Sequence, residues 1–394
     1  KQDAETPQDA EKRAKLEKLD SIHLTQSVME LLRPRDFSEI VGQERAVKSL
    51  LAKLSSPYPQ HLLLYGPPGV GKTTAARLVL EAARKKPASP FREDAPFVET
   101  DGTTLRWDPR DITNPLLGSV HDPIYQGAQK TLADSGIPEP KPGLVTEAHG
   151  GILFIDEIGE MDEMLQNKLL KVLEDKRAYF ESAYYDPTDP KVPPYIRKLF
   201  EEGAPADFVL IGATTRSGLL TSPLRARFGI TCHLEYYDAP VLAGIVRRSA
   251  RILDVSIDDD AAHEVALRSR GTPRIANALL RRVRDFAMVK GEGHIDLEIT
   301  RIALAALNID SRGLDQMDNK ILGAIIEKFN GGPVGLNTVA TAVGEEAGTI
   351  EEVYEPFLIK EGFLQRTPRG REATPLAYQH LGFTHPRDGE ASLF

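Results

Sequence analysis

Residues 66–73 read GPPGVGKT and match the phosphate-binding pattern G-x-x-x-x-G-K-[ST]. Its glycines let successive backbone N–H groups converge on phosphate oxygens at a helix N-terminus. We expect Lys72 to neutralise the β- and γ-phosphates and Thr73 to ligate magnesium. A plain Gly/Pro-rich turn is the alternative, but an apolar run precedes the motif and a helical pattern follows it, which favours a nucleoside triphosphate site.

Two neighbouring carboxylates, Asp156 and Glu157, follow the apolar run at residues 151–155. Such a run fits a central parallel strand, whose carboxyl end faces the ligand in open α/β sheets. We expect Asp156 to hold magnesium through its water shell and Glu157 to polarise the attacking water. A solvated strand end is the alternative, which the phosphate-binding motif disfavours.

Further polar residues could act on the γ-phosphate. Thr214 follows the apolar run at residues 208–213 and could orient the water, although a threonine there is more often only a β former. Arg225, Arg227 and Arg274 come after the predicted nucleotide core, where arginines can stabilise charge on the transferring phosphoryl group. Taken singly, most such arginines form surface ion pairs, and the order of the motifs is what favours a role at phosphate.

Near the C-terminus, Arg366, Arg369 and Arg371 lie in a segment without acidic residues, 363–371. Three helical patterns followed by a turn at residues 368–370 predict a winged helix, with this hairpin as the wing. Three arginines on a hairpin are well suited to bind DNA phosphates without base specificity. A solvated hairpin with protein-facing arginines is the alternative.

The spacing of apolar residues predicts the elements that position these groups. Residues 31–237 alternate strand-sized runs with helical stretches, which is typical of an α/β domain with a parallel sheet. Long insertions at residues 103–148 and 181–207 are expected to be functional loops. Residues 238–309 adopt a helical period and predict a small helical domain, which the winged helix follows at residues 315–385.

Composition bounds the remaining possibilities. The chain has 394 residues, 41% of them hydrophobic, which is enough for two or three domains. No apolar run approaches the roughly 20 residues of a membrane span. The single cysteine, Cys232, excludes an internal disulfide and a cysteine zinc cluster, so magnesium is the only metal expected. These features predict a cytoplasmic protein without a membrane partner.

Charge is distributed unevenly along the chain. Residues 1–30 carry many charges and few apolar residues, which predicts an exposed helix or a linker. The net charge of −9 argues against indiscriminate coating of nucleic acid, although a local basic patch could still hold a phosphate backbone.

The order of the motifs resembles that of AAA+ ATPases over residues 33–308, which implies an AAA+ core followed by a helical lid. Within that class, residues 214–383 look very similar to RuvB, the family of bacterial Holliday-junction branch-migration motors. The resemblance lies in five stretches, at residues 213–229, 270–277, 281–286, 331–336 and 362–371.

Residues 27–212 look instead like the ATPase module of a Bacillus-type Lon protease, without its protease domain. The matching stretches are residues 118–127, 148–160, 167–175 and 180–185. The two resemblances meet at residues 212–216, which both families share. A natural or engineered fusion is therefore expected.

The resemblances imply roles for single residues. Arg227 would act in trans on the next subunit's nucleotide with support from Arg225, and Thr214 and Arg274 would be the first and second sensors. In the Lon-like part, Tyr125 would be the aromatic residue of a pore loop that grips polypeptide. Contacts to adenine and ribose would come from Leu32, Arg33, Ile40, Val41 and Tyr237. Contacts to phosphate would come from Pro68, Gly69, Val70, Gly71, Lys72, Thr73 and Thr74, with Glu174 and Asp175 near the nucleotide.

The leading hypothesis is a magnesium-dependent ATPase that binds ATP and ADP, forms a homo-oligomeric, hexameric ring and acts on DNA, as RuvB does on four-way junctions. In RuvB, the segment between the acid-pair helix and the first sensor docks RuvA. Here residues 179–206 look Lon-like, which makes a RuvA-type partner doubtful.

Two other functions are weighed against this one. A Lon-type protein unfoldase core would use the RuvB-like part only as a lid and as a DNA or assembly module. A scaffold that holds ATP without turnover is disfavoured, because Lys72, Asp156, Glu157 and Arg227 are all present.

Overall fold

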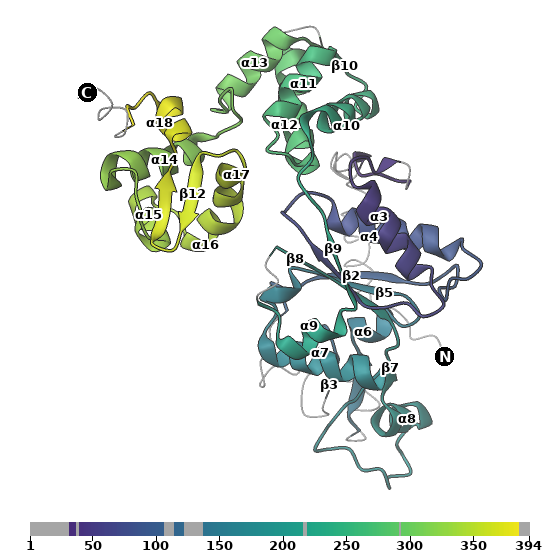
Figure 1. Ribbon diagram of the computed structural model, residues 1–394. Coiled ribbons are helices and arrows are strands. Elements are labelled where there is room, and N and C mark those ends of the chain that lie inside the picture. The colour runs from purple at the N-terminus through teal and green to yellow at the C-terminus, as the bar shows by residue number, and fades with distance from the viewer. Residues whose placement is uncertain are drawn as a thin grey trace, which may run out of the picture.

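The computed structural model describes residues 31–36, 39–105, 114–121, 137–215, 219–290 and 293–385. Figure 1 shows a core built on a sheet, a helical domain next to it and a separate C-terminal domain. Two expectations, the charged segment at residues 1–30 and the pore-loop Tyr125, lie outside the described residues. Within those residues, no helix has the length and apolar character needed to cross a membrane.

The core sheet has five strands in the order β2-β5-β8-β1-β9, and all of its pairings are parallel. Its strands are β1 (Leu62–Tyr65), β2 (Phe97–Asp101), β5 (Ile152–Asp156), β8 (Val209–Thr214) and β9 (Ile230–His233). The inner strands β5 and β8 are buried along nearly their whole length, not at alternate residues. Such strands need cover on both faces, and the predicted parallel α/β core is confirmed.

Alternate residues of the inner strands enter two different hydrophobic cores, because successive side chains point to opposite faces of a sheet. Phe154 of β5 packs in the core that holds α3 (Glu44–Leu54) and α4 (Lys72–Arg84). Its neighbour Leu153 packs in the core of α7 (Glu163–Asp175). The sheet is therefore covered by helices on both faces, and α4 begins at its carboxyl edge.

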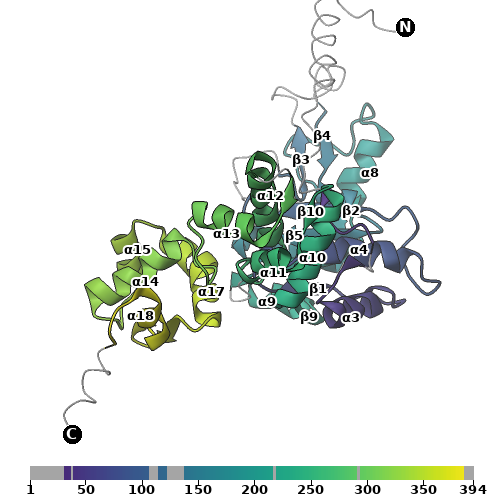
Figure 2. The same cartoon turned by 90° about the horizontal axis from the view of Figure 1, so that it is seen from above.

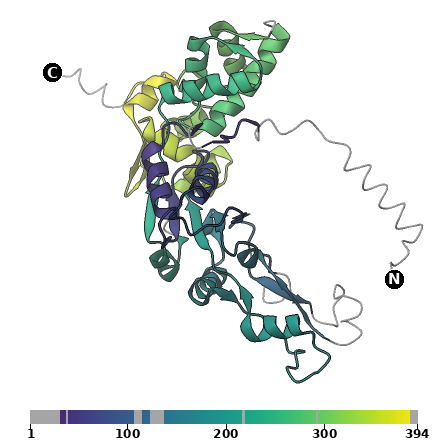
Figure 3. The ribbon, with the colours of Figure 1, turned by 90° about the vertical axis from the view of Figure 1, so that its right-hand side faces the viewer.

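Six short elements lie outside the five-stranded sheet, in or next to the two insertions that the sequence predicted. Figures 1 and 3 place α8 at the end of the core that is remote from the helical domain. The six elements are β3 (Gly118–His121), β4 (Glu139–Pro142), α6 (Leu144–Glu147), β6 (Arg177–Ala178), α8 (Pro194–Glu202) and β7 (Ala204–Pro205).

The helical domain is the lid that the sequence predicts. Its apolar faces belong to the same hydrophobic core as α3 and α4, so the lid packs on that side of the sheet. Pro273 opens the longest lid helix at its first position, where a missing N–H costs nothing. The lid elements are α10 (Ala239–Ile252), β10 (Ser256–Ile257), α11 (Asp259–Leu267), α12 (Pro273–Lys290), β11 (His294–Ile295) and α13 (Leu297–Ala306).

The C-terminal domain is a winged helix with a hydrophobic core of its own. Three helical stretches precede an antiparallel hairpin, as predicted, at residues 316–329, 336–343 and 347–360, and one more helix follows it. The third stretch consists of two short helices joined by a π-helical turn. Figures 1 and 2 both place α17 on the side that faces the rest of the chain. The elements are α14 (Gln316–Phe329), α15 (Leu336–Val343), α16 (Ala347–Thr349), a π-helical turn (Ile350–Tyr354), α17 (Glu355–Lys360), β12 (Leu364–Thr367), β13 (Gly370–Ala373) and α18 (Pro375–Leu381).

Gly370 at the hairpin turn tests this packing. Its φ is 142°, and an added Cβ would lie 2.4 Å from the carbonyl oxygen of Val334. We expect Gly370→Ala to lower the free energy of unfolding of the winged helix by about 1–3 kcal/mol. Gly344→Ala is the matched control, because φ there is 70° but nothing lies within 4 Å of the added Cβ. Equal losses for the two variants in calorimetric unfolding would contradict the described hairpin.

Candidate functional site

The phosphate loop joins the carboxyl end of β1 to the first turn of α4. Gly69 and Gly71 have φ values of 81° and 95°, a region that favours glycine. A Cβ at Gly66 would lie 2.4 Å from the carbonyl oxygen of Leu234, so no larger residue fits there. The N–H groups of a helix's first turn have no partner within the helix and bind anions well. The loop therefore has the backbone geometry of a phosphate site.

Lys72, the first residue of α4, is buried over this loop and only 6% exposed. Its ammonium donates to the carbonyl oxygens of Gly66 at 2.8 Å and Pro67 at 3.1 Å. Burial lowers the pKa of Lys72, while the nearby Asp156 and Glu157 oppose that shift. The ammonium is thus held by weak neutral acceptors that the oxygens of a phosphate can replace.

The two acids lie at the end of β5, facing the same loop. Asp156 ends the strand and accepts a hydrogen bond from the backbone N–H of Glu157 at 3.1 Å. Glu157 has a φ of 44° and precedes a 3-10 turn at Ile158–Glu160. Burial raises the pKa of both carboxyls, which makes Glu157 a better proton acceptor than a solvated glutamate.

A threonine that the sequence interpretation did not choose contacts Glu157. Thr215 donates to the Glu157 carboxylate from its backbone N–H at 3.2 Å and from its hydroxyl at 3.3 Å. Thr214 is 1% exposed within β8, and its carbonyl oxygen accepts from the N–H of Gly66 at 3.3 Å. Two threonines in a row at a strand end were the available signal, but the sequence could not show that Thr215 contacts Glu157.

A cavity of about 770 Å³ lies between the core and the lid. That volume is in the range of sites for small molecules and cofactors. The cavity is lined by all the residues expected to contact nucleotide or magnesium within one chain, except Thr214, Glu174 and Asp175. The expected residues that line it are Leu32, Arg33, Ile40, Val41, Pro68, Gly69, Val70, Gly71, Lys72, Thr73, Thr74, Asp156, Glu157, Tyr237 and Arg274.

The cavity wall also contains a bridge that sequence patterns could not indicate. Arg248 of α10 forms an ion pair with Glu39 and donates to the carbonyl oxygen of Leu32 at 3.3 Å. Glu39 and Arg248 are 209 residues apart in the chain. On the core side, Gln43 donates to the carbonyl oxygen of Glu235 at 2.7 Å. These bonds tie the segment before α3 to the lid and to the strand that leads into it.

Arg274 brings the lid into contact with the phosphate loop. It is the second residue of α12, and its backbone N–H donates to the carbonyl oxygen of Gly69 at 3.5 Å. A Cβ at Gly69 would lie 3.1 Å from the Cβ of Arg274. Nearby, the hydroxyl of Tyr237 donates to the carbonyl oxygen of Val70 at 3.4 Å, and burial raises the pKa of Tyr237 to about 12. The loop is thus enclosed from the lid side.

Arg225 and Arg227 lie elsewhere, on α9 (Ser222–Arg227) at the other face of the sheet. Arg227 is 43% exposed and forms an ion pair with Glu174 at the end of α7, while Arg225 donates to the carbonyl oxygen of Leu220 at 3.2 Å. Neither Glu174 nor Asp175 lines the chain's own cavity, and their expected place near a nucleotide stays a prediction. They do not line the cavity because α7 covers the face opposite to α4.

The three wing arginines have different surroundings. Arg371 is 13% exposed and its guanidinium lies 3.0 Å from the carboxylate of Glu355, which is 2% exposed. Arg366 is 55% exposed and donates to Glu351 at 2.8 Å. Arg369 is exposed at the turn. Arg371 therefore faces the protein, as the alternative interpretation of the hairpin expected, whereas Arg366 and Arg369 lie at the surface.

Comparison with known families divides the chain into three matched parts. The model of the ATPase family associated with various cellular activities (AAA) matches residues 62–236. The RuvB AAA lid domain matches residues 237–310, and the RuvB C-terminal winged helix domain matches residues 311–382.

Whole-chain comparisons give the same relationship. The Holliday junction branch migration complex subunit RuvB of Parabacteroides distasonis is 48% identical over 357 residues, which cover 89% of this chain and 90% of that protein. The subunit of the same name from Christiangramia forsetii is 46% identical with the same coverage. The structure of the Thermotoga maritima RuvB Holliday junction branch migration motor superposes with a TM-score of 0.68 and 37% identity, covering 90% of this chain and all of that one.

These matches run through the segment that was expected to come from a Lon-type protease. Relatives that align over about nine-tenths of both proteins leave no separate origin to be assigned to residues 27–212, and nothing in the comparisons supports a fusion. The matched parts account for the core, the lid and the winged helix. The chain therefore belongs to the RuvB family of AAA ATPases, in which an ATP-hydrolysing core is followed by a helical lid and a winged helix.

Proposed function

We propose that this chain is the subunit of a ring-shaped motor, a hexamer, that uses ATP hydrolysis to move DNA through a four-way junction. One observation carries the proposal: relatives named for Holliday junction branch migration align over 89% of the chain. The RuvB lid and winged-helix models match residues 237–310 and 311–382. Movement of DNA needs both the cavity and the winged helix, because ATP hydrolysis in the cavity would supply the free energy and the winged helix would bind the DNA.

In the proposed mechanism, the phosphate loop and Lys72 hold the triphosphate, and Glu157 removes a proton from the attacking water. Thr215 orients the Glu157 carboxylate through its two hydrogen bonds. Thr73 and Asp156 both line the cavity beside the loop, and their oxygens suit a magnesium ion. Bound there, the ion would neutralise charge on the β- and γ-phosphates.

Arg227 is proposed to act on the nucleotide of a neighbouring subunit. The Arg227 side chain does not line the cavity of its own chain. It is 43% exposed and forms an ion pair with Glu174, which is 47% exposed. An exposed ion pair is weak and easily exchanged for a phosphate. Hydrolysis would then require two subunits, which explains why a ring is part of the proposal.

DNA is proposed as the translocated polymer. Polypeptide, the substrate under the Lon-type interpretation, has no support from the comparisons. Arg366 and Arg369 are the proposed phosphate contacts of the wing. The doubt about a RuvA-type partner rested on a Lon-like origin of residues 179–206, which the comparisons do not support. The proposed function does not depend on such a partner.

The first prediction separates nucleotide binding from hydrolysis. Lys72→Ala should abolish detectable ATP binding, because the phosphates lose their main cation. Glu157→Gln should bind ATP normally but hydrolyse it about 10²–10⁴-fold more slowly, as expected for loss of a general base. Fluorescent-nucleotide binding and steady-state turnover distinguish the two variants. Glu163→Gln, at the exposed start of α7, is the control. A Glu157→Gln variant that turned over ATP at the parent rate would refute the assignment of the base.

The second prediction tests action between subunits. Arg227→Ala should bind ATP like the parent yet fail to hydrolyse it. Mixed with Lys72→Ala subunits, it should recover part of the activity, because some interfaces then pair an intact cavity with an intact arginine. Lys176→Asn removes another exposed cation that is ion-paired on the same side of the core and should change little, because asparagine tolerates the φ of 56° at this position. Verified mixed rings without any recovery would argue against action in trans.

The third prediction concerns the wing. Replacing Arg366 and Arg369 by Ala should make the slope of log affinity against log salt on duplex DNA shallower, by about 0.9 for each phosphate that the wing no longer neutralises. ATP turnover without DNA should persist. Arg92→Ala removes an arginine that is 84% exposed on the surface of the ATPase domain, and it should leave the slope unchanged. If the parent binds DNA no more tightly than the double variant, and casein stimulates its ATPase, polypeptide is the better candidate.

A further inference from the structure

The turn between α11 and α12 holds an arginine whose backbone conformation needs an explanation. Arg270 has a φ of 54°, a left-handed conformation in which glycine or asparagine is less strained than arginine. It is 9% exposed and lies four residues before Arg274. A strained arginine at a buried turn indicates that its side chain makes interactions that the surrounding structure requires.

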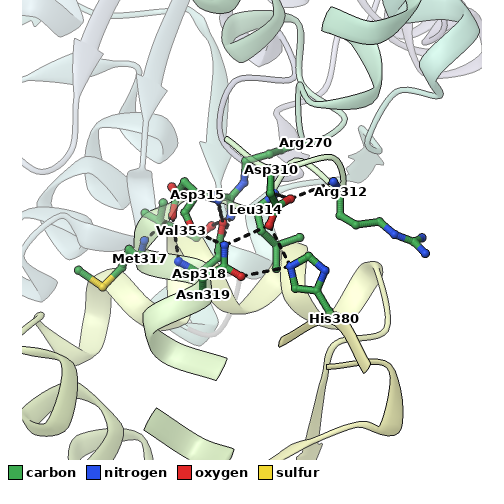
Figure 4. Close-up of polar contacts among 10 residues, drawn as sticks. All are labelled: Arg270, Asp310, Arg312, Leu314, Asp315, Met317, Asp318, Asn319, Val353 and His380. Atoms are coloured by element: carbon green, nitrogen blue, oxygen red, sulfur yellow. Dashed lines mark hydrogen bonds and ion pairs between the residues drawn. The ribbon is translucent and has the colours of Figure 1, made fainter. Parts of the chain in front are cut away.

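The Arg270 side chain leaves the lid and enters the winged helix (Figure 4). Its guanidinium donates to both carboxylate oxygens of Asp318, at 2.8 and 3.3 Å, and Asp318 is fully buried. It also donates to the carbonyl oxygen of Val353 at 3.3 Å and lies 4.4 Å from the ring centre of Phe357. Three parts of the winged helix thus converge on one lid residue.

Asp318 is well placed to fix the guanidinium. It is the third residue of α14 and accepts a hydrogen bond from the backbone N–H of Asp315, which completes a capping box at the start of that helix. Asp315 itself lies 3.4 Å from the guanidinium. A guanidinium and a carboxylate joined by two parallel hydrogen bonds fix each other's position and orientation.

The other side of the same turn lies against the nucleotide cavity. The backbone N–H of Tyr237, which lines the cavity, donates to the carbonyl oxygen of Gly271 at 2.8 Å. Arg274 follows and contacts Gly69 of the phosphate loop. Lys360 of the winged helix lies 4.6 Å from the ring centre of Tyr236, which strengthens the junction at this point.

The contacts continue from Arg270 to the wing. Val353 and Phe357 flank Glu355 in sequence, and the buried carboxylate of Glu355 pairs with Arg371 of β13. Packed and ion-paired residues therefore connect the wing hairpin with the phosphate loop through a single turn of the lid.

We propose that Arg270 is a positioning residue for ATP binding: by pairing with Asp318, it lets the winged helix hold Arg274 against the phosphate loop. The inference rests on the proposed role of Arg274 at the nucleotide. With the pair broken, the turn would sample positions in which Arg274 does not reach the loop. A smaller competent fraction weakens the apparent affinity for ATP and leaves the rate of the bound state unchanged.

The test compares Arg270→Asn, Asp318→Asn and the double variant with the parent in the full chain, without DNA. Asparagine tolerates the left-handed backbone at position 270 but is too short to reach Asp318. At position 318 its amide oxygen can still accept from Asp315. Arg247→Asn is the matched control, because it removes an arginine that pairs with Asp259 inside the lid.

Each single variant is expected to raise the KM for ATP about fivefold or more, with kcat at saturating ATP within twofold of the parent. The double variant should be no worse than the more affected single variant, because both act through one contact. Arg270→Lys, which keeps the charge without the fork, should give an intermediate KM. Arg247→Asn should leave the KM unchanged.

A KM within twofold of the parent in all three variants would overturn the inference. So would a lower kcat at an unchanged KM, since that pattern means only fewer folded molecules. If Arg270→Asn alone fails to fold, the double variant decides by the same criterion, because no unpaired buried carboxylate remains in it. Loss of DNA binding by the parent would refute the proposed function and leave this test intact, because no DNA is used.

Discussion

Burial of the Lys72 ammonium at the carboxyl edge of the sheet is the interaction on which the rest of the site depends. A buried cation is costly unless acceptors surround it. Here those acceptors are the carbonyl groups of the phosphate loop, and the field of Asp156 and Glu157 adds to them. The parallel sheet brings the loop after β1 and the acids after β5 to one edge, although Lys72 and Asp156 lie far apart in the sequence.

The same edge explains the arrangement of the other domains. The loop is open on one side, and there the lid supplies Arg274, Tyr237 and Arg248 as a cover. The winged helix contacts the chain next to that cover, at Arg270 and at Tyr236, so it is attached to the part of the chain that encloses the cavity. In contrast, α7 and α9 carry Glu174 and Arg227 on the far face, and neither residue lines the chain's own cavity. A subunit built in this way has its cavity on one side and its exposed arginine on another.

Much of the fold and of the site could be predicted from the sequence, because local patterns dictate them. The phosphate loop needs glycines at fixed positions, and the acids must end a buried strand, so Lys72, Asp156 and Glu157 were found without any structure. Contacts between distant segments could not be found in this way. The contact between Thr215 and Glu157 joins residues 58 positions apart, and the burial of Arg371 depends on Glu355 from another element. Local similarity also misled, since short Lon-like stretches predicted a fusion that the whole-chain comparisons do not support.

The central claim is that ATP hydrolysis in this chain moves DNA. The most direct measurement follows a synthetic four-way junction with labelled arms in the presence of the parent protein, and compares ATP with no nucleotide and with the Glu157→Gln variant. The account predicts that only the parent with ATP separates the junction into two labelled duplexes, without cutting any strand. A parent that hydrolyses ATP at full rate while the junction stays intact, under conditions in which it is bound, would contradict the account.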